Sequence, residues 1–411
     1  MGFIDSLFGK RSMDLANPSD SDVAWLSGGN RSYAGKVVNE TTALSYIAVF
    51  SCVNVISETM ASLPLHLYRD KGSNGRAKAR EKKLYDLLHS RPNEEMTSFT
   101  FRQVLQACIL LWGNGYAFID WGPDGEPRGL YPQHPSKVIP KRNPTTKKMG
   151  YEVAGPDGKV INLSADQMLH LVGFSLDGLV GLSVIGLARE SIGLGQAAEE
   201  YGSRFFSNGA KPLGVLEHPG ELGEDAIKHL RSSWDEMHKG LENSHKVAIL
   251  EEGMTYKQIG IPPEDAQFLQ TRKFQLEEIA RLYRVPLHLV GNLDKATFSN
   301  IEHQDIGFAK HTIRPWAVRW EQTLNWKLLT TEERKQYYAE YNLDGLMRGD
   351  MKSRYEAYQI GRQNGWLSGN DIRDKENEDK IEGLDAYLVN GNMIPVNMAG
   401  QQYLKGGEKS E

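Results

Sequence analysis

The first residues of the chain contain a glycine pair of the kind found in phosphate-binding loops. Gly2 and Gly9 are followed by Lys10 and Ser12, the residue types that hold phosphate and magnesium in such loops. Six residues separate the two glycines, whereas the loop needs four, and no predicted strand precedes them. We therefore do not expect residues 2–12 to bind a nucleotide.

Two further stretches resemble functional motifs but do not have the spacing or the structural context that these motifs require. Gly193, Gly195 and Ala198 match the dinucleotide fingerprint only superficially, because they fall within a predicted helix rather than at a strand-to-helix turn. Backbone N–H groups inside a helix are not free to bind a pyrophosphate, and packing of small residues between helices is favoured instead. Residues 181–186 have one residue too many for a nucleophile elbow, so Ser183 is predicted to cap a helix.

The histidines give no metal-binding pattern. The chain has 11 of them, and none shows the HExxH spacing. His303 and His311 are eight residues apart, with Glu302 and Asp305 nearby, and could at most face the same side of one helix. Because no group of residues combines a nucleophile, a base and an orienting residue, we expect neither an enzyme nor a cofactor or metal site.

Composition is that of an ordinary soluble protein. The 411 residues are enough for two or three structural units, and the formal charge is −5 with 25% charged residues. A protein that binds nucleic acid tightly usually has a basic excess, and this chain has none. Cys52 and Cys108 lie in separate apolar stretches and are predicted to be buried free thiols in a reducing compartment.

No membrane segment is expected. The most apolar window, residues 43–56, is shorter than the ~20 residues that cross a bilayer. Residues 1–6 fit a myristoylation pattern but lack the basic start and cleavage site of a secretory signal. Nothing else in the sequence suggests a membrane partner.

The pattern most informative about architecture is a helix, a polar loop and a second, long helix. The first helix is predicted from Glu264 to Arg284, after a proline pair and before Pro286. One face is apolar and should pack, while the other is charged and should contact water. The apolar face contains Phe268, Leu269, Leu276, Ile279 and Tyr283, and the charged face contains Lys273, Glu277, Arg281 and Arg284.

The second helix follows the polar loop. Ser299 and Glu302 match a capping box at its start. It is predicted to continue to about Thr330, roughly thirty residues or about 45 Å.

A proline lies near the middle of this long helix. Pro315 removes one backbone hydrogen bond and clashes with the preceding turn, so we predict a kink there. Trp316 and Trp320 are expected to pack beyond the bend.

These two helices and their loop resemble the stem, tunnel loop and kinked helix of portal proteins from long-tailed, siphovirus-type bacteriophages. The resemblance rests first on EEIARLYRVPLHLVGN and ATFSNIEHQDIGFAKHTIRPWAVRWEQTLN. Further stretches similar to the family are AVFSCVNVISETMASLPLHLYR, MTSFTFRQVLQACILLWGNGYAFI, GFSLDGLVGLSVI and MKSRYEAYQIGRQNGWLSGNDIRDKENEDKIEGLD.

The predicted fold class is α+β. Helices are expected at about 42–62, 82–89 and 98–112, with a strand at 65–68 and a basic, solvated loop at 71–83. Strands should follow at about 116–121, 129–131, 137–141, 151–153 and 160–163, then a long helix at 183–208. Later elements are a strand near 213–217, a helix near 223–239, and strands near 246–250 and 255–259. A strand at 337–341 is expected to return to the earlier sheet. Helical structure should follow over 349–384, with its acidic end at 371–382 exposed to solvent.

The resemblance implies a portal fold that assembles as a ring. Its parts would be a flexible arm (1–40), an α/β wing (41–182), a first stem helix (183–209), a small α/β clip (210–263), a second stem helix (264–285), a tunnel loop (286–299), a kinked helix with the return to the wing (300–344), a helical crown (345–385) and a flexible tail (386–411).

The resemblance also implies a function. A dodecameric ring at one capsid vertex would let DNA in during packaging by the large terminase subunit and out at ejection. Further implied partners are the major capsid protein or scaffold, the head-completion adaptor and tail proteins. The protein would be part of the virion, assembled in the bacterial cytoplasm.

Two groups of residues are hypothesised to contact the passing duplex. Leu293, Asp294, Lys295 and Thr297 of the loop would face the DNA, weakly and without sequence preference. Channel-lining residues of the second stem helix would be Arg272, Lys273, Arg281 and Arg284, although this side could equally face solvent or form Glu277–Arg281 pairs. Two alternatives are a nucleotide-dependent enzyme of the packaging machine and a structural adaptor ring without DNA passage.

Overall fold

The computed structural model describes residues 31–72, 75–143, 146, 148–155, 159–207, 214–238, 253–258, 264–292, 298–343, 346, 351–376 and 379–388. The chain forms two compact units, Met1–Asn342 and Leu343–Glu411. Within the described residues, no helix is both long and apolar enough to cross a lipid bilayer.

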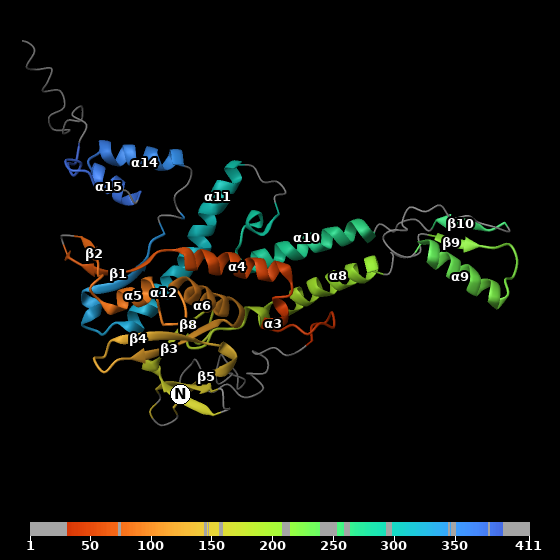
Figure 1. Cartoon of the computed structure of the whole chain (residues 1–411), viewed down its shortest axis with the longest axis horizontal. Coiled ribbons are helices and arrows are strands. Elements are labelled where there is room, and N and C mark those ends of the chain that lie inside the picture. Colours follow the sequence, from red (N-terminus) through yellow and green to blue (C-terminus); the bar gives the residue numbers. More distant parts are fainter. Residues whose placement is uncertain are drawn as a thin grey trace, which may run out of the picture. The chain divides into compact units, whose positions relative to one another are not determined.

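Helices make up much of the first unit (Figure 1). They are α3 (Glu40–Ala43), α4 (Ile47–Ser62), α5 (Lys83–His89), α6 (Ser98–Trp112), α7 (Val184–Leu187), α8 (Arg189–Ser207), α9 (Glu224–His238), α10 (Glu264–Tyr283), α11 (Phe298–Phe308) and α12 (Arg314–Leu328). A 3₁₀ turn, η5 (Leu287–Val290), follows α10, and a π-helical turn, η6 (Ala309–Ile313), joins α11 to α12.

The strands form small antiparallel sheets. In spatial order these are β11-β1-β2, β4-β3-β8, β5-β6-β7 and β10-β9. The strands are β1 (Leu65–Asp70), β2 (Arg76–Lys78), β3 (Asn114–Trp121), β4 (Pro127–Gln133), β5 (Val138–Arg142), β6 (Met149–Ala154), β7 (Val160–Ser164), β8 (Met168–Val172), β9 (Gly214–Glu217), β10 (Thr255–Gln258) and β11 (Tyr337–Tyr341).

The core of the first unit lies between α4, α6, α12 and the sheet of β3. The α4 and α6 helices pack on each other, α6 packs on β3, and α12 packs on β8 and β11. Trp320 on α12 is 1% exposed, and its indole N–H donates to Gln106 Oε1 on α6 at 2.8 Å. Its ring meets Phe101 edge to face, with centroids 6.4 Å apart. The prediction that Trp320 packs in the core is confirmed, while Trp316 is only partly buried.

Most predicted elements are found close to their expected bounds, and the α+β class is confirmed. The return of β11 to the earlier sheet is also confirmed, because Leu65 pairs with Tyr341 and Arg69 with Tyr337. Ser183 caps α7 as predicted, with its hydroxyl accepting from the N–H of Gly186 at 3.0 Å.

The first half of the chain differs from the predictions in four places. The helix expected over 42–62 is interrupted, because Asn39 and Thr42 form a capping box that starts the separate helix α3. Residues 31–40 are not a free arm, since Val38 is 1% exposed. The basic stretch at 71–83 is largely exposed, as predicted, but it contains the strand β2, where Arg76 pairs with Glu340 at 2.6 Å. Strand β8 was missed, because it is buried along most of its length and shows no alternation.

The second unit contains α14 (Met351–Gln363) and α15 (Gly369–Lys375). The expected helical stretch 349–384 is therefore two helices, and residues 379–385 are not helical. Glu376 belongs to the acidic end that was expected to be solvated, yet it accepts from Arg354 at 2.9 Å and from the Tyr358 hydroxyl at 2.7 Å. Ser368 and Asp371 form a capping box at the start of α15.

Candidate functional site

The two long helices α8 and α10 lie side by side (Figure 1) and are joined by polar contacts. The Ser191 hydroxyl donates to Glu278 Oε2 at 2.7 Å and contacts Gln275 Oε1 at 3.4 Å. On the adjoining face of α10, Ile279 and Tyr283 are buried, and the Tyr283 hydroxyl donates to the Leu110 carbonyl at 3.3 Å. The apolar face predicted for this helix is confirmed at these positions. The helix packs on α4, and the Tyr283 hydrogen bond joins it to α6.

The small residues of α8 contact two neighbours. Ser191 contacts α10, in agreement with the prediction that small residues allow packing between helices. In addition, a Cβ at Gly195 would lie 2.7 Å from the Tyr46 ring, and one at Gly193 would collide with Ser32. The glycines therefore make room for the segment 32–46, which explains why residues of the predicted arm are packed.

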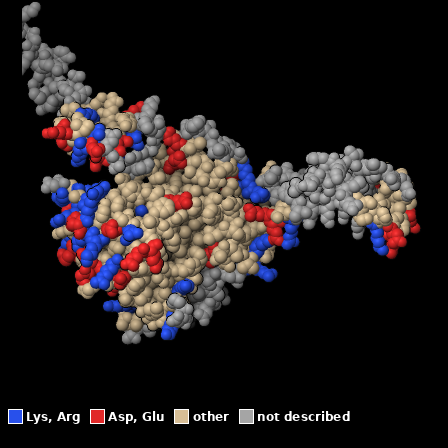
Figure 2. Space-filling model, viewed as in Figure 1, with Lys and Arg blue, Asp and Glu red and all other residues tan. Residues whose placement is uncertain are grey.

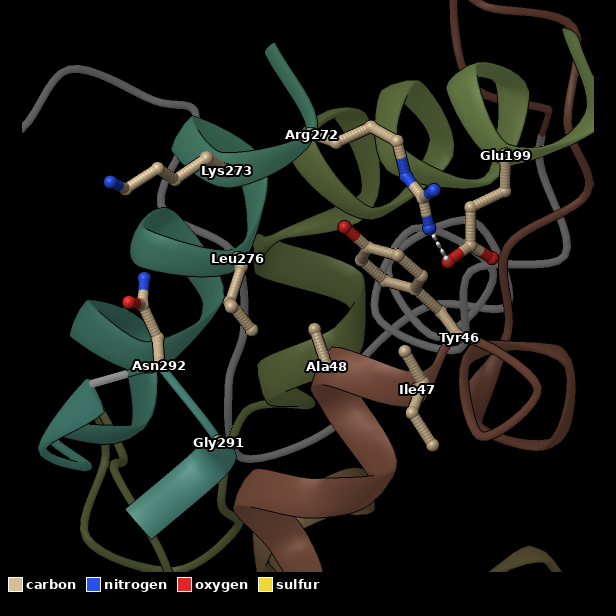
Figure 3. Close-up of a pocket in the computed structure, with 9 residues that line it drawn as sticks. All are labelled: Tyr46, Ile47, Ala48, Glu199, Arg272, Lys273, Leu276, Gly291 and Asn292. Carbon is tan, nitrogen blue, oxygen red and sulfur yellow. Dashed lines mark ion pairs between the residues drawn. The ribbon is translucent and has the colours of Figure 1, made fainter. Parts of the chain in front are cut away.

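A cavity of about 390 Å³ lies between α4, α8 and α10 (Figure 3). Within it, Arg272 points toward Glu199 across the Tyr46 ring, with an ion pair of 3.5 Å, whereas Lys273 points away from that pair. Burial, reinforced by the charge of Glu199, raises the pKa of Tyr46 to about 12. The lining residues are Tyr46, Ile47, Ala48, Glu199, Arg272, Lys273, Leu276, Gly291 and Asn292.

The four predicted channel-lining cations do not form one surface. Arg272 pairs with Glu199 in the same chain. Arg272 and Arg281 are nine residues apart, so they project from opposite sides of a helix with 3.6 residues per turn. The side chains of Lys273, Arg281 and Arg284 are exposed. At most some of these four side chains can therefore face a common channel.

The end of α10 carries a backbone feature that sequence analysis missed. The helix ends at Tyr283, and Arg284 has a φ of 56°, a left-handed conformation that favours glycine. The N–H of Val285 bonds to the Ala280 carbonyl at 2.9 Å and that of Arg284 to the Arg281 carbonyl at 3.1 Å, which is a Schellman motif. The Thr312 hydroxyl donates to the Arg284 carbonyl at 2.7 Å and so ties this end of α10 to η6.

The helical distortion near Pro315 is located one turn before the proline. The chain is helical from Phe298 to Leu328, with the π-helical turn at Ala309–Ile313. Proline has no backbone N–H to donate to the preceding turn of a helix, and its ring needs space there. The π-helical turn is wider than an α-helical turn and accommodates the ring. Such π turns are a recognised cause of bends. A kink at Pro315 itself stays a prediction.

The loop residues hypothesised to face DNA, Leu293, Asp294, Lys295 and Thr297, lie outside the described residues. Both flanks are described. The N–H of Asn292 bonds to the Leu287 carbonyl at 3.0 Å, so η5 closes tightly before the loop. The capping box expected at Ser299 was wrong in position, because Phe298 is already helical.

One side chain joins the two flanks of the loop. His288 in η5 lies 2.8 Å from Asp305 Oδ1 through Nε2 and 3.0 Å from Gln304 Oε1 through Nδ1. Asp305 was noticed in the sequence only as a possible metal ligand beside His303. Because His288 and Asp305 are 17 residues apart in the sequence, no helical or strand periodicity predicts their contact.

The remaining chemical candidates have simple roles. Cys52 and Cys108 are buried free thiols, as predicted, and burial raises the pKa of each to about 12. Among the described residues, no group of three or more His, Cys, Asp or Glu is placed to hold a metal ion. Gly193 and Gly195 lie inside α8, so their backbone cannot form a pyrophosphate site.

Charges on the described surface are interspersed. On the face shown in Figure 2, Lys and Arg lie beside Asp and Glu rather than forming a continuous basic area. Many cations are paired locally, such as Lys82 with Glu333 at 2.9 Å and Lys83 with Asp124 at 2.8 Å. On this face, the charges of the described residues therefore do not form the continuous basic surface that holds nucleic acid tightly.

A mixed α/β body that carries two packed helices, a short loop and a helix with a π turn is the architecture of a phage portal subunit. Residues 47–377 match the family described as phage portal protein, and the chain belongs to that family. As a portal protein, it is a virion component at a capsid vertex, the passage through which a phage genome is packaged and ejected.

Individual relatives agree with this assignment. The chain is 33% identical to a probable portal protein of Streptomyces phage phiC31, over 92% of this chain and 85% of the relative. It is also 33% identical to the portal protein of Enterobacteria phage HK97, over 88% and 86%. The fold is similar to a chain in the neck of a native gene transfer agent particle computed with C12 symmetry, with a TM-score of 0.60, 23% identity and coverage of 87% and 98%.

Proposed function

We propose that the chain assembles into a closed ring of twelve copies, the symmetry with which the similar neck structure was computed. The observation that carries this proposal is the family match over residues 47–377, which includes both long helices and the loop between them. In a cyclic ring each copy uses two different surfaces, one for each neighbour.

A row of exposed apolar side chains supports contact between copies. This row, here named the α8 stripe, consists of Leu187 at the end of α7 and of Leu194 and Tyr201 on α8, which are 56%, 47% and 52% exposed. The seven-residue spacing keeps Leu194 and Tyr201 on one side of α8, and Leu187 precedes them across the break at Ala188. Exposed apolar rows of this kind are typical of protein interfaces, so we assign the α8 stripe to a neighbouring copy.

The loop of residues 293–297 is proposed to face the passing duplex. Its two flanks are joined to each other by the contacts of Thr312 with Arg284 and of His288 with Asp305. Lys295 is the only basic residue of the loop, so each copy would offer one positive charge to the phosphates. A single weak contact per subunit would allow DNA to slide without being held in place.

Substitution tests the role of the loop. Particles with Lys295→Ala or Asp294→Ala are expected to package and retain full-length DNA several-fold less well, because the first change removes the cation that contacts phosphates and the second removes the neighbouring anion that keeps this contact weak. The measurement is the yield of full-length DNA per particle, with Lys310→Ala, an exposed cation on η6, as the control. Wild-type yields for both loop variants would show that these residues do not contact DNA productively.

Residues 210–263 are proposed to dock the terminase motor and later the head-completion adaptor. The described part of this region has its own pairing, with Thr255 opposite Glu217 and Gln258 opposite Gly214. It begins after α8 and ends before α10, so its sequence position allows removal as a unit. The major capsid protein or scaffold is proposed to contact the rest of the ring.

Deletion of this insertion tests the docking role. A chain with residues 210–263 replaced by a short glycine and serine linker is expected to form rings but to lose detectable binding to the large terminase subunit. Native mass spectrometry reports the ring, and a pull-down with purified terminase reports the binding. If the shortened chain binds terminase as the full chain does, the docking surface lies elsewhere. If the shortened chain does not form rings, residues 210–263 are needed for assembly of the ring.

We infer that the protein acts by geometry and not by catalysis. The proposal is supported by the match to a family of portal proteins and by the burial of Cys52 and Cys108, which raises the pKa of both thiols. Purified rings are therefore not expected to turn over ATP.

A further inference from the structure

The contact of His288 fixes the ends of the loop to each other. His288 lies in η5, three residues before Gly291, and its partners Gln304 and Asp305 lie in α11, on the other side of residues 293–297. The His288 side chain is 9% exposed, whereas Asp305 is 50% exposed. The imidazole is thus held in place while its acidic partner remains accessible to water.

Both ring nitrogens of His288 have a partner. The Nε2 N–H donates to the Asp305 carboxylate at 2.8 Å, and Nδ1 lies 3.0 Å from the Gln304 amide. Because an amide can present its oxygen or its NH₂ group, the Gln304 contact suits either protonation state of the ring. Hydrogen bonds to a charged group are stronger than neutral ones, so the Asp305 contact should dominate.

We propose that His288 is a latch that holds the second half of α11 against η5 and thereby fixes the two flanks of residues 293–297 to each other. The Thr312–Arg284 contact joins the end of α10 to η6, about two turns further along the long helix than Asp305, so α11 needs a contact of its own to be held against η5. The consequence for DNA rests on the proposed function of the loop, but the latch itself does not.

Trypsin can report on the latch directly. Lys295 is the single lysine or arginine between Arg284 and Lys310, so a cut after Lys295 gives a unique pair of fragments. Local opening of a segment controls its cleavage. In the assembled full chain, His288→Ala is expected to raise the initial rate of this cut by about tenfold, the effect of losing a hydrogen bond to a charged group.

Matched variants separate the latch from a general loss of stability. His303→Ala removes an exposed histidine from the same helix and is expected to be cut at the wild-type rate. His288→Gln retains an amide N–H for Asp305 and is expected to restore most of the protection. The double variant His288→Ala with Asp305→Asn should be cut no faster than His288→Ala alone, because each substitution removes the same contact between His288 and Asp305.

Three outcomes are informative. A wild-type rate of cleavage after Lys295 in His288→Ala would overturn the latch. So would faster cleavage at all sites together with a lower unfolding temperature, because His288 would then act through overall stability. If the cut after Lys295 alone is faster while His288→Ala particles package DNA normally, the latch stands and the proposed role of the loop in DNA passage is wrong.

Discussion

Trp320→Ala is expected to lower the free energy of unfolding of the chain by about 3–5 kcal/mol, the range for replacing a buried tryptophan. The side chain is 1% exposed and is among the largest fully buried side chains. Its removal leaves a cavity between α12 and α6 and takes away the donor to Gln106. The measurement is the midpoint of thermal or denaturant unfolding.

The same helix offers a matched control. Trp326 is 64% exposed, and its ring lies 4.6 Å from the Lys327 ammonium. Trp326→Ala should change stability by less than about 1 kcal/mol, because little apolar area is lost from the interior. Equal destabilisation by the two variants would mean that the contact between α12 and α6 does not hold this unit together.

The second large effect is expected at the α8 stripe. Leu187→Glu combined with Leu194→Glu should leave each chain folded but convert rings into monomers or small open assemblies. Both positions are exposed in the single chain, so the glutamates meet water there, whereas a closed interface would have to bury unpaired charges. Mass photometry of the purified variant gives the distribution of assembly sizes.

An exposed apolar residue elsewhere serves as the control for this experiment. Val160 on β7 is 59% exposed, and Val160→Glu is expected to leave the rings unchanged. Rings of wild-type size in the double α8 variant would remove the stripe from the subunit interface. Unfolded chains in that variant would instead show that the exposed residues stabilise the single subunit.

Much of the fold could be predicted because its elements have strong local signals. Helix α6 was predicted with its observed bounds, since Thr97 caps it and Gly113, with a φ of 77°, ends it. The long helices were predicted from prolines and apolar periodicity. Strand β8 was not predicted, because a strand that is buried on both faces shows no alternation of apolar and polar residues.

The site was less predictable because its contacts are distant in sequence. Nothing local to Gly193 and Gly195 shows that they accommodate Ser32 and Tyr46. The partner of Arg272 is Glu199, on a different helix. Similarly, the left-handed conformation of Arg284 has no sequence signal, because glycine is the residue that usually occupies this position.

The central claim is that copies of this chain close into a ring with residues 293–297 at its axis. Electron microscopy of the purified full-length protein tests it most directly. We predict closed rings, twelve copies in the assembled form, with a central hole wide enough for a DNA duplex and with α10 and α11 leading to its rim. Compact monomers at every concentration, or rings in which α10 and α11 lie on the outer surface, would contradict this account.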